Sequence, residues 1–207
     1  MSAIDARQLQ TLLAALRRSF EARPPQADAI GDEIRKVAAA LDGLPSHPRL
    51  VEPTFHPLTR HLPSALSLAG VSDPGAAAPL SPAAALLPWR YGYLPRPDAP
   101  ALEDAMGWAE IAGPDAPFQS NGVCFGLTLI GPRTYYMPHK HPARELYYVL
   151  AGQAAWTAGG STAAKAPGDY ILHPENMIHA MRTGGEPLLA IYSWTGDVHS
   201  PSVWSND

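Results

Sequence analysis

The chain contains a single cysteine, Cys124, among its 207 residues. One cysteine excludes an internal disulfide and any zinc site built from several thiolates. Cys124 lies in the apolar run Val-Cys-Phe-Gly-Leu-Thr-Leu-Ile, which predicts a buried core position and not a nucleophile or a ligand. Any catalytic or metal-binding chemistry must therefore come from other side chains.

Long hydrophobic runs and an excess of basic charge are also missing. The apolar stretches are short and broken by Gly or Pro, so we expect no membrane-spanning segment and no membrane partner. Lys and Arg number 15 against 19 Asp and Glu, and the formal net charge of −4 leaves no basic stripe for nucleic acid. The first residues, MSAIDARQLQTLL, include acids and no apolar signal-peptide core, so we expect a cytoplasmic protein.

Apolar residues in segment 1–44 repeat with helical spacing. The first helix ends at Pro24-Pro25, and the second begins after Asp28, a candidate N-cap, and stops near Gly43. Two short amphipathic helices need a surface, either the rest of the chain or a second subunit, which leaves a homodimer open. The segment is not strongly basic and Pro-Pro does not suit a helix-turn-helix, so DNA binding is not expected. The apolar faces comprise Leu9, Leu12, Leu13, Leu16 and Phe20, then Ile30, Ile34, Val37 and Leu41.

Residues 45–100 are rich in Pro and Ala, and the whole chain has 23 prolines. Leucines at 58, 62, 66 and 68 predict a short helix. His47, His56 and His61 each lie near a proline, and we expect them to face solvent or to make local hydrogen bonds. The run 88–93, Pro-Trp-Arg-Tyr-Gly-Tyr, is a candidate lid or pocket wall that includes Trp89, although packing alone would also explain its aromatic residues.

The remainder of the chain has the pattern of short strands joined by tight turns. The predicted strands are often β-branched or aromatic and are separated by Gly or Pro, which favours an antiparallel sandwich or barrel. We therefore expect a helical and Pro-rich N-terminal extension over 1–100 that packs on a metal-binding β-barrel over 101–207. The predicted strands are 107–112, 123–130, 134–138, 145–150, 154–158, 170–173, 178–182 and 188–194.

The most informative segment is His139-Lys140-His141-Pro142-Ala143-Arg144-Glu145, followed later by His179. Two histidines two residues apart in an extended chain project to the same side, because side chains alternate along a strand. Three imidazoles and one carboxylate make a mixed nitrogen and oxygen site of the kind that holds a divalent first-row metal. The alternative is a polar surface loop. His173 and His199 have no comparable spacing and are left outside the predicted site.

Two glycine-framed motifs carry a resemblance to a known superfamily. Gly131 leads to His139-x-His141-x3-Glu145-x6-Gly152, which resembles the first motif of the cupins, and Gly168-x5-Pro174-x4-His179 resembles the second. Asn176 replaces the usual glycine of the second motif, and the asparagine expected after its histidine is absent. The resemblance implies a mainly β protein, a cupin barrel (double-stranded β-helix or jelly-roll) with an α-helical N-terminal extension.

A narrower resemblance rests on three aromatic residues. Tyr147 follows the glutamate by two residues, Tyr136 precedes the histidine pair, and Trp194 lies on the last predicted long strand. With the helical extension, this pattern is similar to the cupin-type dimethylsulfoniopropionate (DMSP) lyases, especially the DddQ branch. The match covers the C-terminal half, whereas residues 1–100 agree only in overall layout.

This resemblance implies a carbon–sulfur lyase that converts DMSP into dimethyl sulfide and acrylate with one divalent transition metal ion. It implies that His141, Glu145 and His179 hold the metal, and that Tyr147 lies at the metal and serves as the base. It leaves His139 either as a further ligand or as a substrate contact. Fe(II), Zn(II), Mn(II), Co(II) and Ni(II) all suit such a donor set, so the identity of the metal stays open.

The residue types agree with this chemistry. Removing a proton alpha to a carboxylate creates a highly charged anion, which a divalent cation stabilises. A free tyrosine has a pKa of about 10, and a nearby cation favours its anion. Tyr147 shares strand parity with Glu145 and can reach the same interior, whereas Tyr148 points the opposite way.

Aromatic side chains are candidates for binding the sulfonium end of the substrate. Tyr136, Tyr192 and Trp194, with Trp89 as a further candidate, would each contribute roughly 0.5–2 kcal/mol through cation–π contacts. Tyr136 is also a second candidate catalytic residue, because it lies next to the metal-binding segment. Core filling is the competing interpretation, and it is favoured for Tyr192 and for Trp156.

Two other classes of function stay open. One is a different cupin metal enzyme, an Fe(II) dioxygenase or an isomerase, that acts on a small carboxylate. The other is a non-catalytic cupin that binds a small molecule, for which Tyr147 beside the metal would have no use. DMSP itself could also be replaced by a related betaine or acyl compound.

Overall fold

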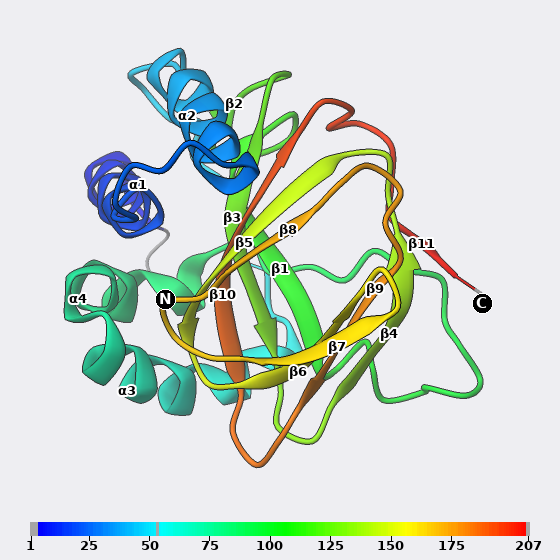
Figure 1. Ribbon diagram of the computed structural model, residues 1–207. Helices are drawn as coiled ribbons and strands as arrows, with labels where there is room; N and C mark the ends of the chain where they lie inside the picture. The colour runs from blue at the N-terminus through cyan, green and yellow to red at the C-terminus, as the bar shows by residue number, and fades with distance from the viewer. Residues whose placement is uncertain (1–3, 53, 206–207) are drawn as a thin grey trace.

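The computed structural model describes residues 4–52 and 54–205. The helices all precede the strands along the chain (Figure 1). They are α1 (Ala6–Phe20), α2 (Ala29–Asp42), the 3-10 helix η1 (Pro57–His61), α3 (Leu62–Ser72), α4 (Pro74–Ala83) and the 3-10 helix η2 (Ala84–Leu86).

The two N-terminal helices begin at aspartates that cap them. The Asp5 side chain accepts a hydrogen bond from the Gln8 amide, and the Gln8 side chain accepts one from the Asp5 amide, which makes a capping box. The Asp28 side chain accepts from the Gly31 amide, so the predicted N-cap is confirmed. The predicted helix faces pack against the core, with Leu9, Leu12, Leu16, Phe20 and Val37 at 0% exposure, whereas Leu13 and Ile30 are only partly buried.

The helix α4 was not predicted, because its sequence is rich in proline. Pro74 occupies the first turn, where proline is tolerated, and the Asp73 side chain accepts a hydrogen bond from the Ala76 amide. Pro79 and Pro82 lie inside the helix, where each removes a backbone donor. Packing of α4 against α1 and α3 therefore outweighs a poor local preference.

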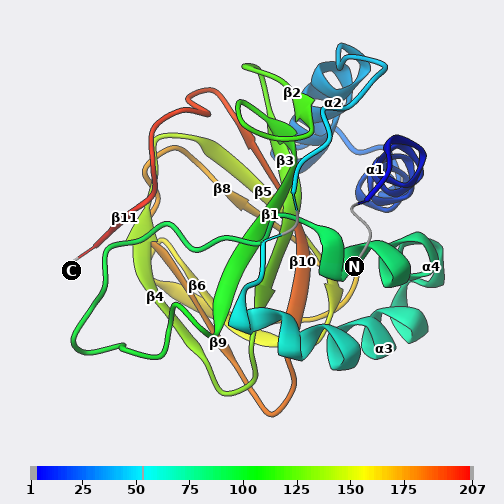
Figure 2. The same ribbon diagram turned by 180° about the vertical axis from the view of Figure 1, so that it is seen from behind.

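The strands form two sheets whose inner sides face one another (Figure 2). In the described residues the six-stranded sheet has the order β2-β1-β3-β10-β5-β8, and the five-stranded sheet has the order β11-β4-β9-β6-β7. The strands are β1 (Met106–Gly113), β2 (Phe118–Gln119), β3 (Cys124–Ile130), β4 (Tyr135–Lys140), β5 (Arg144–Ala151), β6 (Ala154–Ala158), β7 (Ser161–Lys165), β8 (Tyr170–His173), β9 (His179–Thr183), β10 (Leu188–Thr195) and β11 (Val203–Trp204).

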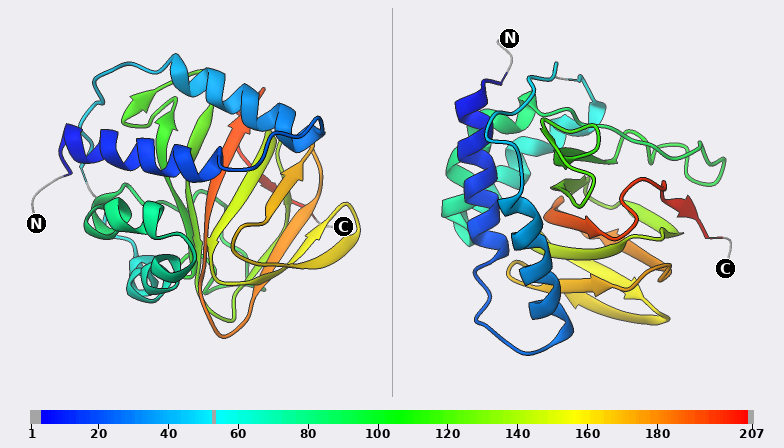
Figure 3. Two further views of the ribbon diagram at one scale, coloured as in Figure 1. Left: turned by 60° about the vertical axis from the view of Figure 1, so that its left-hand side comes forward. Right: turned by 90° about the horizontal axis from the view of Figure 1, so that it is seen from above.

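The six-stranded sheet is covered on both sides. Its helix-facing side packs against α1 to α4, which form a layer beside the sheets (Figure 3). Its inner side faces the five-stranded sheet and belongs to a second apolar cluster. Residues alternate between the two sides along each strand, as a pleated strand requires. On β5, for example, Leu146 and Leu150 join the helix-facing cluster, whereas Tyr147 and Val149 join the inner cluster.

The eight predicted strands are confirmed with shifts of at most two residues at their ends, and the two sheets confirm the cupin fold. Strands β2, β7 and β11 were not predicted. The short helix expected around the leucines at 58–68 is present as η1 and α3. The division of the chain into two domains at residue 100 stays a prediction. Tyr93, which belongs to the predicted extension, packs in the inner cluster between the sheets. No helix of the described chain is long and apolar enough to cross a bilayer.

Candidate metal centre and pocket

The predicted metal ligands come from three strands and from the loop that follows the first of them. His139 lies on β4, Glu145 lies on β5, and His179 is the first residue of β9. The sequence suggested that both histidines of the motif lie within one extended segment. In the structure only His139 does, because His141 follows the end of β4. His139 pairs with His179 in the register of β4 and β9, which brings the second motif beside the first. All four residues are at most 2% exposed.

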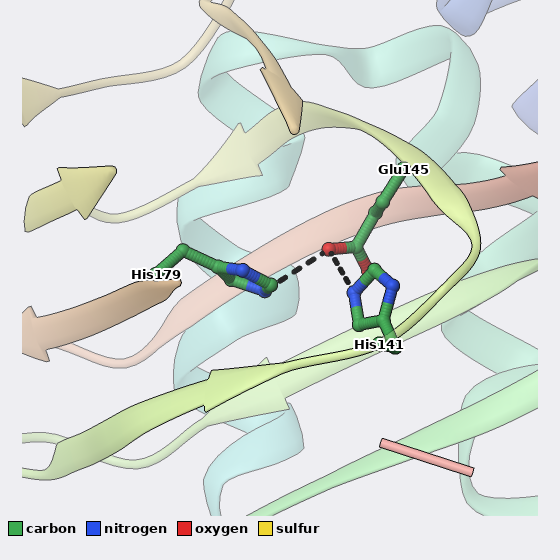
Figure 4. A group of neighbouring side chains, drawn as sticks. All are labelled: His141, Glu145 and His179. Atoms are coloured by element: carbon green, nitrogen blue, oxygen red, sulfur yellow. Dashed lines mark hydrogen bonds and ion pairs between the residues drawn. The ribbon is translucent and has the colours of Figure 1, made fainter. Parts of the chain in front are cut away.

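His141, Glu145 and His179 each offer one ligand atom, and these atoms all lie within 4.8 Å of one another (Figure 4). The Nε2 atoms of His141 and His179 lie 3.1 and 3.2 Å from the same carboxylate oxygen, Oε2 of Glu145. The His139 ring lies beside this group, with its centroid 4.0 Å from that of His179. The structure thus brings all four predicted ligands together. His141, Glu145 and His179 form the centre of this cluster, and His139 lies at its side.

The backbone fixes which nitrogen of each imidazole faces the centre. The Nδ1 atoms of His139, His141 and His179 lie 2.8, 3.0 and 2.8 Å from backbone carbonyl oxygens. A carbonyl only accepts, so each Nδ1 carries the hydrogen, and a neutral ring then presents an Nε2 lone pair. His179 Nε2 is buried and makes no hydrogen bond in the described residues. A buried nitrogen without a hydrogen-bond partner, next to a carboxylate, suits a cation site. A metal ion would bind the nitrogen lone pair and balance the carboxylate charge.

The electrostatics of the group follow from burial and from close pairing. Burial opposes the Glu145 charge, but His141 and then His173 outweigh it and hold the pKa of Glu145 well below its usual range. Burial also opposes a charge on His141, yet Glu145 raises the pKa of His141. Burial and the neighbouring His179 hold the pKa of His139 well below its usual value. The carboxylate is therefore ionised, and His139 is neutral.

His173, which the sequence analysis left outside the site, lies directly against Glu145. Its Nδ1 is 3.0 Å from Glu145 Oε2, and its Nε2 accepts a hydrogen bond of 3.0 Å from the Trp156 indole. Because Nε2 is occupied, His173 donates from Nδ1 to the carboxylate and has no free nitrogen for a metal. Burial lowers the pKa of His173 to about 4, so the ring is a neutral donor that orients Glu145.

Trp194 holds the other oxygen of the carboxylate. Its indole N–H donates to Glu145 Oε1 at 2.7 Å, and its ring lies 4.2 Å from the His141 ring between centroids. The two oxygens of Glu145 thus have different partners, with the indole at Oε1 and the histidines at Oε2.

Tyr147 and Tyr136 both reach the inner side, as predicted. Tyr147 is 4% exposed, and burial together with the Glu145 charge raises its pKa well above 10. Tyr136 stacks on His139 with ring centroids 3.9 Å apart, and its hydroxyl contacts the Tyr93 hydroxyl. The Tyr93 hydroxyl donates in turn to Ser202 Oγ at 2.7 Å, so Tyr136 is the donor of the pair.

A cavity of about 340 Å³ opens over this centre. Its wall also contains a second buried carboxylate, Glu110, which lies 3.1 Å from Arg90 and accepts a 3.2 Å hydrogen bond from the Tyr192 hydroxyl. The charge of Glu110 is thus already paired. The aromatic wall consists of Tyr93, Trp108, Tyr136, Tyr147, Tyr192 and Trp194. Tyr93 and Trp108 were not singled out from the sequence, although the run 88–93 was.

Several other predicted positions can now be placed. Trp89 does not face the cavity; it is 1% exposed in the helix-facing cluster, and its indole donates to the Ala84 carbonyl. Cys124 is buried at the cavity wall, and burial raises the pKa of its thiol. Trp156 is a core residue, as predicted. His199, also left outside the predicted site, lies exposed at the rim of the cavity.

The histidines of the Pro-rich segment do not line the cavity over the centre. His47 is exposed, His56 caps η1 by accepting from the Leu58 amide, and His61 accepts from Arg60. These contacts agree with the predicted local roles.

The two facing sheets of a jelly roll, with a histidine and carboxylate cluster compatible with a metal site between them, define this protein as a cupin. Comparison with known families is more specific. Residues 31–190 match the model of the family described as dimethylsulfoniopropionate lyase, and the match covers more than half of the chain. The chain therefore belongs to the DMSP lyase family.

Individual relatives agree with this assignment. Dimethylsulfoniopropionate lyase DddQ of Ruegeria pomeroyi is 31% identical over 122 residues, which cover 58% of this chain and 61% of the relative. The chain aligns with 61% of the length of the curated relatives that it matches.

The similarity to solved structures extends along almost the whole chain. A structure from work on the DMSP lyases RdDddP and RnDddQII has a TM-score of 0.81 and 26% identity, and the match covers 97% of this chain and 98% of that one. The structure of DddQ from Ruegeria pomeroyi has a TM-score of 0.76 and 26% identity, with 96% of each chain covered. The helical extension therefore takes part in the structural match, beyond what the sequence motifs covered.

Proposed function

We propose that this protein is a metal-dependent DMSP lyase, a carbon–sulfur lyase that forms dimethyl sulfide and acrylate. The observation that carries the proposal is the buried group of His141, Glu145 and His179 beneath an aromatic cavity, in a chain of the DMSP lyase family. A cavity of about 340 Å³ suits a small substrate that lies within reach of these residues.

The proposed cofactor is one divalent transition metal ion. His141, Glu145 and His179 would hold it, and His139 lies close enough to be a fourth ligand or to contact the substrate. The donor set suits Fe(II), Zn(II), Mn(II), Co(II) and Ni(II) alike. When bound, such an ion supplies positive charge that stabilises the anion formed from the substrate and the phenolate of Tyr147.

Aromatic side chains would bind the sulfonium end of DMSP. Trp194 lies next to His141, Tyr136 stacks on His139, and both rings also line the cavity beside the proposed ligands. Each face contributes roughly 0.5–2 kcal/mol toward a desolvated cation. Tyr192 also lines the cavity, but its hydroxyl is already engaged as a donor to Glu110.

Tyr147 is the proposed base. It removes a proton from the carbon alpha to the carboxylate, and the electron pair forms the new carbon–carbon double bond as the bond to sulfur breaks. Dimethyl sulfide leaves as a neutral molecule, so this step needs no acid, and acrylate and one proton complete the balance. Burial and Glu145 favour the neutral phenol, so the tyrosine can act as a base only with a compensating positive charge close by.

Tyr136 is a less suitable base. Burial raises its pKa well above 10, as do the neighbouring Tyr93 and Tyr147, and its hydroxyl already donates to Tyr93. We assign Tyr136 the role of fixing the His139 ring and forming the cavity wall.

The test is to incubate the metal-loaded protein with DMSP in the absence of oxygen and to measure headspace dimethyl sulfide and acrylate. We expect both products in equal amounts with at least one of the five metals. Protein that binds a metal but yields neither product with any of them would contradict the proposal. In a separate assay in air, oxygen consumption with a small carboxylate would instead indicate a dioxygenase. A matched control is Glu110→Gln, which alters the other buried carboxylate of the cavity and should retain metal.

The cellular location and the oligomeric state of the protein are two further proposals. We propose a cytoplasmic protein, which fractionation of its native cells tests. A homodimer also stays a prediction, although the apolar helix faces that suggested it pack on the chain's own sheet. Light scattering during size-exclusion chromatography tests the homodimer, and a monomer would contradict it.

A further inference from the structure

The second helix carries a buried carboxylate within its apolar face. Glu33 of α2 is 3% exposed and lies one turn before Val37, which is fully buried against the sheet. A charge at such a position is unfavourable unless both of its oxygens are paired. The apolar pattern of α2 does not account for it.

Both oxygens of Glu33 are bound by residues of the six-stranded sheet. Arg144 Nε lies 2.7 Å from Glu33 Oε2, and the Thr195 hydroxyl donates to Glu33 Oε1. Arg144 is the first residue of β5, and Thr195 is the last residue of β10. The two residues are partners in the register of these antiparallel strands. One helical carboxylate therefore joins the ends of two neighbouring strands.

The next pair in the same register belongs to the candidate metal centre. Glu145 follows Arg144, and its partner across the strands is Trp194, which precedes Thr195. The Trp194 indole donates to Glu145 Oε1 at 2.7 Å. Side chains alternate along the strands, so Arg144 and Thr195 meet the helix on one side, and Glu145 and Trp194 meet the cavity on the other. Strand ends fray when nothing holds them, and these ends carry the central carboxylate.

We infer that Glu33 is a positioning residue for the candidate metal centre. By holding Arg144 and Thr195, it fixes the ends of β5 and β10 and so sets the Glu145–Trp194 hydrogen bond. The helical extension thereby contributes to the geometry of the site without touching it. This inference rests on the proposed metal site for its effect on metal binding, whereas the effect on the hydrogen bond can be measured without metal.

The first measurement uses the full-length metal-free protein. The indole N–H resonance of Trp194, assigned by its loss in Trp194→Phe, reports the hydrogen bond to Glu145. Glu33→Gln keeps the size of the side chain but removes the charge that binds Arg144. Thr195→Val removes only the hydroxyl and serves as a second variant if Glu33→Gln folds poorly. We expect both changes to shift the Trp194 resonance and to speed its exchange with water.

The second measurement is the affinity for Zn(II), determined by competition with a chromophoric chelator. Changes to residues that orient a ligand typically weaken metal affinity about 10–100-fold, and we expect a loss of about tenfold or more in Glu33→Gln. Thr195→Ser, which keeps the hydroxyl, should restore the affinity lost in Thr195→Val.

Two controls separate positioning from general destabilisation. Asp32→Asn alters the exposed neighbour of Glu33, and Val37→Ala weakens the packing of the same helix face. We expect neither to move the Trp194 resonance or to change the Zn(II) affinity more than about twofold, well below the 10–100-fold range. A wild-type resonance and affinity in both Glu33→Gln and Thr195→Val would overturn the inference. If the wild-type protein bound no Zn(II), the proposed metal site would fail, while the resonance would still decide the role of Glu33.

Discussion

The two sides of the six-stranded sheet differ in what they bury. On the helix-facing side, the strands contribute Leu127, Leu146 and Ile191, which pack with the helices in a continuous apolar cluster. On the inner side, the adjacent residues of the same strands are Thr128, Glu145 and Tyr192, which line a cavity with titratable groups. Adjacent residues of one strand therefore differ in role: those on the helix-facing side stabilise the fold, and those on the inner side line the candidate site.

Substitutions one residue apart should therefore affect different properties. Changes on the helix-facing side should alter the free energy of unfolding, and changes on the inner side should alter metal affinity and turnover. Glu33 is the exception that we infer, because it acts through the sheet from one side to the other.

The largest effect should come from Tyr147→Phe. This change removes the proposed base, and loss of a positioned base lowers turnover by about 10²–10⁴-fold. We expect kcat to fall within this range while the metal content, measured by elemental analysis, stays at the wild-type level. Retention of wild-type turnover by the folded, metal-loaded variant would refute the role of Tyr147.

Leu127→Ala tests the helix-facing side. Leu127 is 0% exposed in the apolar cluster, and removal of a buried leucine side chain destabilises a protein by about 2–5 kcal/mol. Urea unfolding should report this loss. Because Leu127 does not line the cavity, kcat of the folded fraction should stay within about twofold of the wild-type value. A change of that size is well below the tenfold that about 1.4 kcal/mol produces. A large drop in kcat would show that the two sides are not independent.

Trp194→Phe and Trp89→Phe remove the same indole donor on opposite sides of the sheet. Trp194 donates to Glu145 and Trp89 donates to the Ala84 carbonyl, each at 2.7 Å. Loss of the Trp194 donor should weaken Zn(II) affinity about 10–100-fold, because Glu145 loses an orienting partner. Trp89→Phe should lower stability and leave the affinity unchanged. Equal Zn(II) affinities in the two variants would contradict the distinction between the inner and the helix-facing sides of the sheet.

Tyr148→Phe should have the smallest effect. Tyr148 is half-buried on the helix-facing side, where its ring packs on Tyr170 with centroids 4.8 Å apart. The ring is kept, so we expect a stability change within about 0.5 kcal/mol and an unaltered kcat. A loss of turnover comparable to that of Tyr147→Phe would indicate that strand parity does not decide these roles.

Local patterns predicted most of the fold and much of the candidate centre. Short apolar runs between Gly and Pro gave β6 and β8 with their observed ends, since each strand is complete within its own segment. Period-two alternation placed Tyr147 on the side of Glu145 and Tyr148 on the other. The metal-binding motif is equally local, because its first three members lie within seven residues.

The features that sequence reasoning missed depend on long-range contacts. His173 reaches Glu145, 28 residues away, through the register of β5 and β8, which no local spacing indicates. Tyr93 arrives in the cavity from an irregular segment. Strand β7 is largely exposed and shows no apolar alternation. For Trp89 the sequence left a cavity wall and core packing both open, because an aromatic run does not reveal which of its members face the cavity; the structure places it in the core.

The most direct test of the account is the metal content of the folded protein. Full-length protein, dialysed against Zn(II) and then against buffer, should retain a single ion per chain by elemental analysis. The ion should be lost in Glu145→Ala and His179→Ala and retained in Leu127→Ala. Folded wild-type protein that retains no transition metal would contradict the claim that the inner side of the sheet holds a cation.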